Sequence, residues 1–338
     1  MSDHGPLLGV TMGDPSGIGP EIIAAGYGSL LDHARIVVYG DAGVIERAIT
    51  TTGTDRLVRA VDDPAAAGSD PSSIDVLDFE NVADHAWGVI GADYGEASLA
   101  YVEAAIEDAM AGRIDGFVTA PIHKQAIARA GGDHAGHTGL IADRTGTEDY
   151  SMLLIEEPLR VSHVSTHVPL REAVKAVTTD RVSRVIELTH ATVTKLGVTN
   201  PRVGVAGLNP HAGDGGVLGE EDDREIRPAV QRTRAAGIDA AGPVSGDTIF
   251  TRALQGEFDC VVAMYHDQGH IPVKLRGFDD GGAVTGVNVT IGVPIVRTSV
   301  DHGTAFDIAG TGSASHRSLS DAVRVATRLA AAEQEGSG

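Results

Sequence analysis

The sequence predicts a soluble α/β protein built around a mainly parallel sheet. Short β-branched runs that end at turn residues alternate with segments of helical periodicity along the chain. This alternation is typical of parallel sheets whose strands are joined by helices. The chain has 338 residues, enough for one large α/β unit or for two lobes. Because the composition does not shift anywhere along it, we expect two interwoven lobes rather than two separate domains.

The individual elements follow from this pattern in chain order. The expected strands are Leu7–Met12, Ile36–Tyr39, Phe117–Thr119, Val161–Thr166, Val203–Gly207 and Val261–Tyr265. The expected helices, each with one apolar face, are Tyr101–Met110, Val182–Leu196 and Leu319–Leu329. The stretch Asp62–Ser73 is rich in Pro, Ala, Gly and Ser and is expected to form a surface loop.

Charge and composition exclude several classes of partner. The formal net charge of −21 argues against binding to nucleic acid or to an anionic membrane. No apolar run is long enough to span a bilayer, and the N-terminal residues lack the features of a secretory signal. The single cysteine, Cys260, cannot form an intrachain disulfide and is expected to be buried in a strand. Together these features predict a cytoplasmic protein.

Three histidines stand just past three of the predicted strands. His167, His211 and His266 each follow such a strand and are bordered by turn residues. Neutral imidazoles from separate strand ends can converge on one point, and three protein ligands with a vacant position are typical of a catalytic metal site. We therefore predict that these residues bind one divalent metal (Zn, Mg, Mn or Co). His163 and His270 are expected to support the ligands rather than to bind the metal. The alternative is that each histidine only packs or caps a turn.

Carboxylates and basic residues occupy the same strand-end regions. Asp247 and Asp267 are candidates to orient the histidines or to take a proton. Only four of the 26 basic residues are lysines, so Lys124 and Lys274, which both follow predicted strands, carry extra weight. Together with Arg297 and three uncharged donors, these lysines could bind a small polar anion. The alternative is that they only lie on the solvated surface. The uncharged donors are His137, Thr138 and Asn288.

A glycine-rich turn follows the first predicted strand. The segment Gly13–Ile22, GDPSGIGPEI, runs through Gly17 and Gly19 to Pro20, which is a favoured first residue of a helix. Its amides could face an anion or a substrate. The complete GxGxxG pattern with a downstream acidic residue is missing, so the segment does not predict a Rossmann nucleotide site.

Taken together, these motifs resemble the 4-hydroxythreonine-4-phosphate dehydrogenase family. The resemblance covers nearly the whole chain in order. It is closer to the branch that acts on 4-phospho-D-threonate or 4-phospho-D-erythronate than to the vitamin B6 branch. The stretches that carry it are MGDPSGIGPEI, TAPIHK, GHTGL, STHVPLREA, GLNPHAGDGG, GDTIF, YHDQGHIPVK, GVNVTIG and RTSVDHGTAFDIAG.

The resemblance implies a fold similar to that of isocitrate and isopropylmalate dehydrogenases, with two α/β lobes and a cleft between them. The first lobe would comprise approximately residues 1–130 and 305–338, and the second residues 131–304 with the dimer interface. It implies NAD or NADP bound by the loop Asp301–Ala309, through Gly303, Thr304 and Asp307. It also implies metal ligation by the three histidines, and a homodimer in which His266 comes from the second subunit.

The resemblance assigns the other residues to the substrate. His137, Thr138, Lys274, Asn288 and Arg297 become substrate contacts, with the last three near the phosphate. Three features depart from the family pattern and bear on substrate recognition. They are Gly139 where Glu is common, His123 where Asn is common, and a longer link between Lys274 and Asn288.

The implied reaction is oxidation of a 4-phosphorylated four-carbon hydroxy acid by NAD, followed by decarboxylation of the β-keto acid, with the metal polarising the oxygen. The proton acceptor stays open between Asp247, Asp267, Lys124 and metal-bound water. Two alternatives remain at this point. One is a metal-dependent hydrolase, and the other is a non-catalytic protein that binds a metal or a sugar phosphate.

Overall fold

A computed structural model describes residues 5–132, 136–277 and 285–336. The chain forms two compact units, Met1–Thr147 with Val293–Gly338 and Glu148–Gly292. These boundaries differ from the predicted 1–130 with 305–338. Helix α5 (His137–Thr145) packs on a helix of the first unit, and strand β12 (Arg297–Val300) pairs with a strand of that unit, so both segments belong to it.

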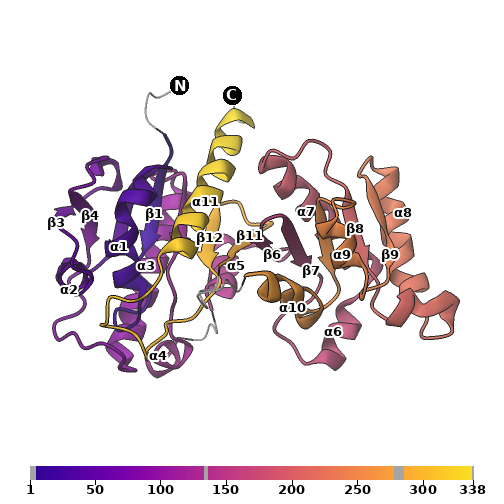
Figure 1. The fold of residues 1–338 in the computed structure, drawn as a ribbon, viewed down its shortest axis with the longest axis horizontal. Coiled ribbons are helices and arrows are strands. Elements are labelled where there is room, and N and C mark those ends of the chain that lie inside the picture. The colour runs from indigo at the N-terminus through magenta and orange to yellow at the C-terminus, as the bar shows by residue number, and fades with distance from the viewer. Residues whose placement is uncertain (1–4, 133–135, 278–284, 337–338) are drawn as a thin grey trace. The chain divides into compact units, whose positions relative to one another are not determined.

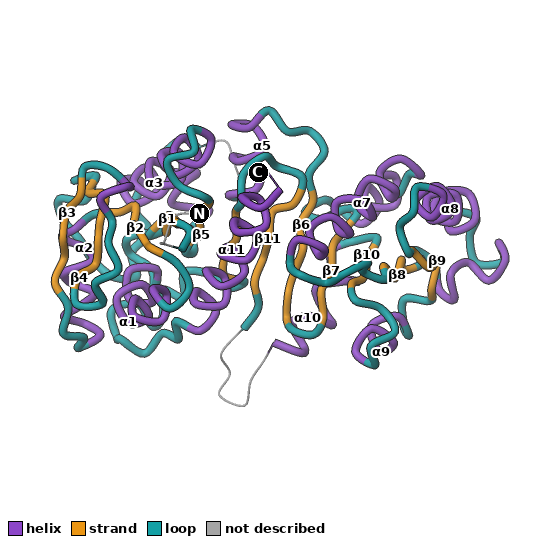
Figure 2. The backbone as a smooth tube through the Cα atoms, turned by 90° about the horizontal axis from the view of Figure 1, so that it is seen from above, coloured by secondary structure: helices purple, strands orange, loops and turns teal. Residues whose placement is uncertain are grey.

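The first unit is a six-stranded parallel sheet covered by helices. Its strand order is β3-β4-β2-β1-β5-β12, and each neighbouring pair in this order is parallel. Figure 2 shows helices α1 and α3 on opposite faces of this sheet. The remaining elements are β1 (Leu7–Thr11), α1 (Gly19–Leu31), β2 (Arg35–Gly40), α2 (Ala42–Thr52), β3 (Leu57–Val61), η1 (Pro64–Ala66), β4 (Ser73–Asp78), α3 (Ala92–Met110), β5 (Gly116–Thr119), α4 (Lys124–Arg129) and α11 (Arg317–Gly336).

The second unit has a mixed sheet in the order β11-β6-β7-β10-β8-β9. Strands β7, β10, β8 and β9 are parallel, whereas β6 pairs antiparallel with both β7 and β11. Helices α7 and α8 lie on one face and α9 and α10 on the other (Figure 2). The elements are β6 (Ser151–Glu156), β7 (Leu159–His163), α6 (Leu170–Ala176), α7 (Thr179–Lys195), β8 (Val203–Ala206), η2 (Pro210–Gly216), η3 (Asp222–Ile226), α8 (Arg227–Ala235), β9 (Ala240–Val244), α9 (Ile249–Leu254), β10 (Cys260–Ala263), α10 (His266–Gly277) and β11 (Val287–Ile291).

The local sequence explains where several helices begin and end. Pro20 stands in the first turn of α1, where its missing N–H has no intrahelical role. Thr178 caps α7 because its hydroxyl accepts from the Arg181 amide at 3.3 Å. Gly53 ends α2 with a φ of 66°, a conformation that favours glycine. These signals fix helix ends before any tertiary packing.

Each unit has its own buried core, and in the second unit this core positions the functional edge of the sheet. Val161 of β7 and Val261 of β10 pack with Phe258, Ile249 and other apolar side chains beneath the sheet. The predicted α/β fold is confirmed, and Figure 1 shows the strands and helices alternating along the chain. No helix in the described part combines the length and the apolar character needed to cross a bilayer.

Candidate active site

The predicted metal ligands all belong to the second unit and follow three neighbouring strands. His167 lies in the turn after β7, His211 lies in the loop after β8, and His266 begins α10 soon after β10. These strands are adjacent and parallel in the order β7-β10-β8. Their carboxyl ends therefore share one edge of the sheet, where ligands collect in α/β folds.

His266 is the centre of a cluster of imidazole rings. Its ring stacks on His270 at 3.6 Å and lies 5.5 Å from the ring of His167, measured between centroids. The Nδ1 atom of His266 is 2.7 Å from a carboxylate oxygen of Asp267. A carboxylate on Nδ1 orients the ring and leaves Nε2 available to a ligand, as in many metal-binding histidines. The chemistry of this donor set fits a divalent metal.

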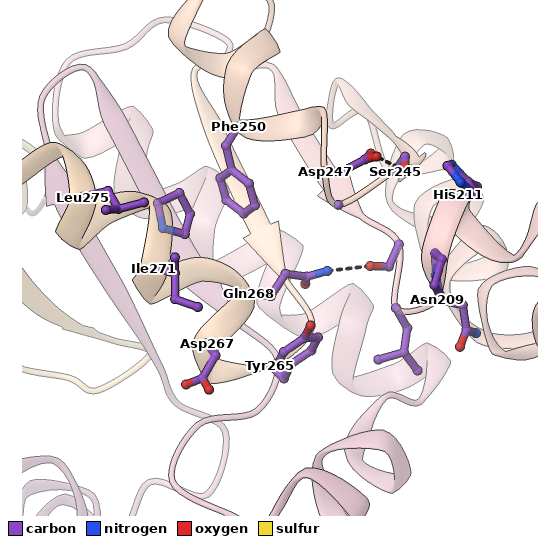
Figure 3. A pocket seen from close by; sticks show the side chains of 15 residues that line it. Asn209, His211, Ser245, Asp247, Phe250, Tyr265, Asp267, Gln268, Ile271 and Leu275 are labelled. Atoms are coloured by element: carbon purple, nitrogen blue, oxygen red, sulfur yellow. Dashed lines mark hydrogen bonds between the residues drawn. The ribbon is translucent and has the colours of Figure 1, made fainter.

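His211 does not join this cluster within one chain. It is exposed, and it stands on a left-handed turn in which residues 211–215 all have positive φ, His211 itself 52°. Figure 3 places it across the pocket from Asp267. Among the residues that the structure describes, no three His, Cys, Asp or Glu side chains come close enough to hold a metal. The predicted convergence of His167, His211 and His266 is therefore not formed by a single chain.

A buried carboxylate holds the start of the turn that carries His211. Asp222 accepts the amide N–H of Leu208 at 2.8 Å, the amide N–H of Asn209 at 3.1 Å and the Nδ2–H of Asn209 at 2.9 Å. Its side chain is fully buried. Non-glycine residues in left-handed conformations persist only when the surrounding structure imposes them. Asp222 supplies this constraint for the His211 turn.

The segments that follow β8, β9 and β10 line one pocket, shown in Figure 3; His211 and Asp267 are among its residues, and His266 is not. Gln268 bridges two of these segments, because its amide N–H donates to the Gly207 carbonyl at 2.7 Å and its oxygen accepts the Met264 amide at 2.7 Å. Asp247 is exposed at the rim and accepts from the Ser245 hydroxyl at 2.7 Å. Asp267 is exposed as well, and its contact with His266 favours an orienting role.

Two predicted substrate contacts also belong to the second unit. Lys274 recurs at four-residue spacing with His266 and His270 along α10, which places the three on one face of the helix. Asn288 stands in β11, and its buried Oδ1 atom has no hydrogen-bond partner among the described residues. An uncharged acceptor without a protein partner suits a site that receives a ligand.

The remaining predicted substrate contacts gather in the first unit. Arg297 is buried at the start of β12, and its Nη2 donates to the Thr119 hydroxyl at 2.6 Å. Burial lowers the pKa of Arg297 to about 9, so the guanidinium stays charged at neutral pH. His137 begins α5, followed by Thr138. Burial, and then the charge of Arg297, lower the pKa of His137, so its imidazole is neutral.

The predicted cofactor loop is tied to the glycine-rich turn after β1. The Thr304 carbonyl accepts the Ile18 amide at 3.1 Å, and a side chain on Gly17 would meet Thr304 at 3.0 Å. Further along, the buried Glu21 carboxylate accepts the Gly312 amide at 3.1 Å. The glycine-rich turn thus supports the loop 301–312. Asp307 is exposed on this loop.

Gly303 of the predicted cofactor loop is not required by the local backbone. Its φ does not lie in the left-handed region, and a side chain there would meet open space. The close approach to protein atoms occurs instead at Gly17, and the left-handed glycines are Gly310, which lies against Trp87, and Gly312, with φ of 82° and 69°. A cofactor could still approach the open side of Gly303, and its predicted role stays a prediction.

His123 and Lys124 lie beside the cofactor loop. The His123 ring stacks on Phe306 at a centroid distance of 4.6 Å and an interplanar angle of 20°. Its buried Nδ1 atom has no hydrogen-bond partner within the described part of the chain. Desolvation, and then Arg129, lower the pKa of His123, so the ring is neutral. Lys124 starts α4 and is exposed.

Two of the departures from the family pattern can be placed. Gly139 is half-buried on α5, directly after the predicted contacts His137 and Thr138. His123 takes part in the stack with Phe306. The longer link between Lys274 and Asn288 includes residues 278–284, which lie outside the described residues.

Several residues that shape the site were not predicted. Thr119 was the last residue of an expected strand, and a search of strand ends for hydroxyls would have found it. Asp222 stands in the acidic run GEEDD, which is typical of a solvated surface. Phe306 and Gln268 carry no local signal, because their roles depend on contacts with distant segments.

Comparison with known proteins defines the class of this fold and site. The chain is 43% identical over 334 residues to D-threonate 4-phosphate dehydrogenase of Cupriavidus necator, covering 98% of this chain and 99% of that protein. It is 46% identical over 330 residues to 4-hydroxythreonine-4-phosphate dehydrogenase of Beijerinckia indica, covering 97% and 96%. The protein is a dehydrogenase that acts on a CH–OH group.

The family model and a solved structure agree with this class. The model described as pyridoxal phosphate biosynthetic protein PdxA matches residues 32–326. A crystal structure of 4-hydroxythreonine-4-phosphate dehydrogenase from Klebsiella pneumoniae superimposes with a TM-score of 0.85 at 40% identity, covering 98% of this chain and 99% of that chain. The chain belongs to the PdxA family.

Proposed function

We propose that the protein oxidises a 4-phosphorylated four-carbon hydroxy acid with NAD and a divalent metal, and that the product then loses carbon dioxide. The observation that carries this proposal is the placement of His167, His266 and His211 at the carboxyl ends of three neighbouring parallel strands. The names of the two relatives support a substrate such as D-threonate 4-phosphate or 4-hydroxythreonine 4-phosphate. The sequence motifs favour the threonate branch.

The chain would supply the metal ligands and their orientation. His167, His211 and His266 would hold the ion, and Asp267 would fix the ring of His266 through its Nδ1 atom. When bound, such an ion acts as a Lewis acid that lowers the pKa of a substrate hydroxyl and polarises a ketone. Lys124 and Asp247 stay candidates for the proton acceptor, because both are exposed and the contact with His266 occupies Asp267.

The chain would bind the phosphate through its cationic side chains. Arg297 and Lys274 would make charge-assisted hydrogen bonds to phosphate oxygens, and Asn288, His137 and Thr138 would bind the uncharged polar groups. The neutral state of His137 suits a hydrogen-bonding role rather than a charge.

The cofactor would lie against the loop Asp301–Ala309. Asp307 is exposed there, and a carboxylate can accept a hydrogen bond from a ribose 2′-hydroxyl but repels a 2′-phosphate. This residue therefore favours NAD over NADP. The stack of His123 on Phe306 would hold the loop in place.

A homodimer would complete the metal site. His211 does not meet the other two ligands in one chain, and the second unit exposes large apolar side chains. Leu275 and Ile271 of α10 are 75% and 57% exposed, Leu170 of α6 is 63% exposed, and Val217 beyond the His211 turn is 78% exposed. Exposed apolar groups of this kind are typical of interaction surfaces.

The test of the proposal is a substrate panel with purified enzyme. D-threonate, D-erythronate and 4-hydroxythreonine would each be supplied with and without the 4-phosphate, with each divalent metal, while NADH absorbance is followed. We expect turnover of a 4-phosphorylated acid with NAD, and release of carbon dioxide in equal amount. No NADH formation from any phosphorylated acid would refute the proposed function.

A further inference from the structure

The hydroxyl of Thr119 lies at the carboxyl end of β5, which is flanked by β1 and β12 in the sheet of the first unit. Thr119 is fully buried and is paired in register with Thr11 of β1 and with Ser299 of β12. Its Oγ1 accepts a hydrogen bond from Arg297 Nη2 at 2.6 Å. Thr119 is the first residue of the TAPIHK stretch, and the resemblance described above gives its hydroxyl no role.

The register explains how a residue at the start of one strand reaches the end of its neighbour. Arg297 lies across from Phe117, two residues before Thr119. Residues two apart on a strand point to the same face, so Arg297 and Thr119 share one face of the sheet. The long Arg297 side chain therefore runs along this face, and the hydroxyl meets its guanidinium at the carboxyl edge.

The orientation of this guanidinium matters because binding to phosphate is directional. A guanidinium presents its donors in a flat fork, and it binds a phosphate best when the fork faces two oxygens. His137 lies close enough for the Arg297 charge to act on its imidazole, so both predicted substrate contacts occupy this region. A fixed partner on Nη2 leaves the guanidinium fewer orientations and reduces the entropy that is lost on binding.

We propose that Thr119 is a positioning residue that fixes the Arg297 guanidinium for binding to the substrate phosphate. The inference rests on the proposed function, because it takes Arg297 to be a phosphate contact. Thr119 does not touch the substrate itself. Its hydroxyl acts as the acceptor that sets the direction of the arginine.

Two substitutions separate the hydroxyl from the volume of the side chain. Thr119→Val keeps the shape and removes the acceptor, and it should raise the KM for the phosphorylated acid about ten-fold, with kcat within about two-fold. Thr119→Ser keeps the acceptor and should restore a KM close to that of the wild type. A wild-type KM in Thr119→Val, or a raised KM in Thr119→Ser equal to that of the valine variant, would overturn the proposal.

Thr298 provides a matched control on the neighbouring strand. It is also fully buried, and its hydroxyl donates to the Ala322 carbonyl of α11 at 2.9 Å. Thr298→Val therefore removes a buried hydrogen bond of similar length from the same sheet without touching Arg297. This variant should keep the wild-type KM even if its thermal stability falls as much as that of Thr119→Val. An equal rise in KM would show a general effect of packing and would overturn the proposal.

A double-mutant cycle tests whether Thr119 acts through Arg297. In an Arg297→Ala background, Thr119→Val should leave the KM unchanged, because the group that it orients is absent. An undiminished ten-fold effect in that background would mean that the hydroxyl acts by another route, against the proposal.

Binding of inorganic phosphate distinguishes this inference from the proposed function. Calorimetry should show weaker phosphate binding in Thr119→Val than in the wild type and in Thr119→Ser. If no phosphorylated acid is oxidised but this difference is found, the proposed function fails and the positioning role stands. If the wild type oxidises such an acid and the valine variant binds phosphate and substrate normally, the positioning role fails alone.

Discussion

Replacement of Asp222 by asparagine should loosen the turn that carries His211. The carboxylate accepts three N–H groups, from Leu208 and from the backbone and side chain of Asn209. An asparagine offers one acceptor oxygen, and its NH2 group must face at least one of these donors. Asp222→Asn therefore removes at least one hydrogen bond to a charged group and creates a contact between two donors.

The size of the free-energy loss in Asp222→Asn follows from the hydrogen bonds that are removed and from the left-handed backbone conformations that they stabilise. One hydrogen bond to a charged group is worth about 1.5–3 kcal/mol. The left-handed conformations of His211, Ala212 and Asp214 have φ of 52°, 54° and 46°, and each is disfavoured by about 1–3 kcal/mol without support. We expect a local loss of roughly 2–3 kcal/mol, and on the scale of other residues that orient metal ligands, a loss of metal affinity of about 10- to 100-fold.

The assay is a competition titration with zinc, combined with amide hydrogen exchange over residues 207–216. Asp223→Asn is the matched control, because Asp223 is the adjacent carboxylate but is exposed and forms an ion pair with Arg227 at 2.6 Å. The control should bind zinc as the wild type does. Wild-type zinc affinity together with unchanged exchange in Asp222→Asn would refute the reasoning.

Four further results are expected. Arg297→Ala should raise the KM for the phosphorylated substrate about ten-fold or more and leave unphosphorylated analogues unaffected, and equal effects on both would exclude a phosphate contact. Mixing His211→Ala with His266→Ala should recover up to about a quarter of wild-type activity if the two residues come from opposite subunits, whereas exchange without recovery would place them in one chain. His123→Ala should weaken NAD binding in calorimetry because it removes the stack beneath the cofactor loop, and unchanged affinity would exclude that role. Burial raises the pKa of Asp14 to about 6, above its unfolded value. The wild type should therefore lose stability relative to Asp14→Asn as the pH rises from about 4 to about 7. Urea unfolding midpoints of the two proteins that change in parallel with pH would contradict this.

The strands that the sequence predicted are those with an unambiguous local pattern. Val203 and Val261 lie in β-branched runs bounded by turn residues, and β8 and β10 begin at Val203 and Cys260. The antiparallel strands β6 and β11 were missed, because the periodicity of a short apolar run such as SMLLIE does not separate a strand from a buried helix, and the flanking Pro158, Gly286 and Gly292 were not weighed. The alternation of strands and helices predicted a mainly parallel sheet but not which strands depart from it, so the antiparallel pairings of β6 emerged only from the structure.

The sequence predicted candidate residues for the site but not the geometry in which the structure holds them. The search of strand ends predicted His167, His211 and His266 as ligands, and the strands that precede them, β7, β8 and β10, are neighbours in the sheet. The left-handed turn at His211 depends on Asp222, and no sequence rule links a histidine to a carboxylate in a later acidic run. Such a contact becomes visible only when the tertiary fold brings the two segments together.

Arg297 shows why a rule based on strand ends needs a correction for side-chain length. It stands at the first residue of β12, at the opposite end of the strand from the residues that collect ligands in α/β sheets. Its side chain nevertheless reaches Thr119 at the carboxyl end of β5, because the two strands are parallel and the guanidinium extends along their shared face. The guanidinium of such a long, flexible side chain lies far from its own backbone, so a hydrogen-bond partner such as the Thr119 hydroxyl is needed to fix its orientation. A search for candidate phosphate contacts in parallel sheets should therefore include long cationic side chains at the first residue of a strand, together with hydroxyls at the carboxyl end of the neighbouring strand.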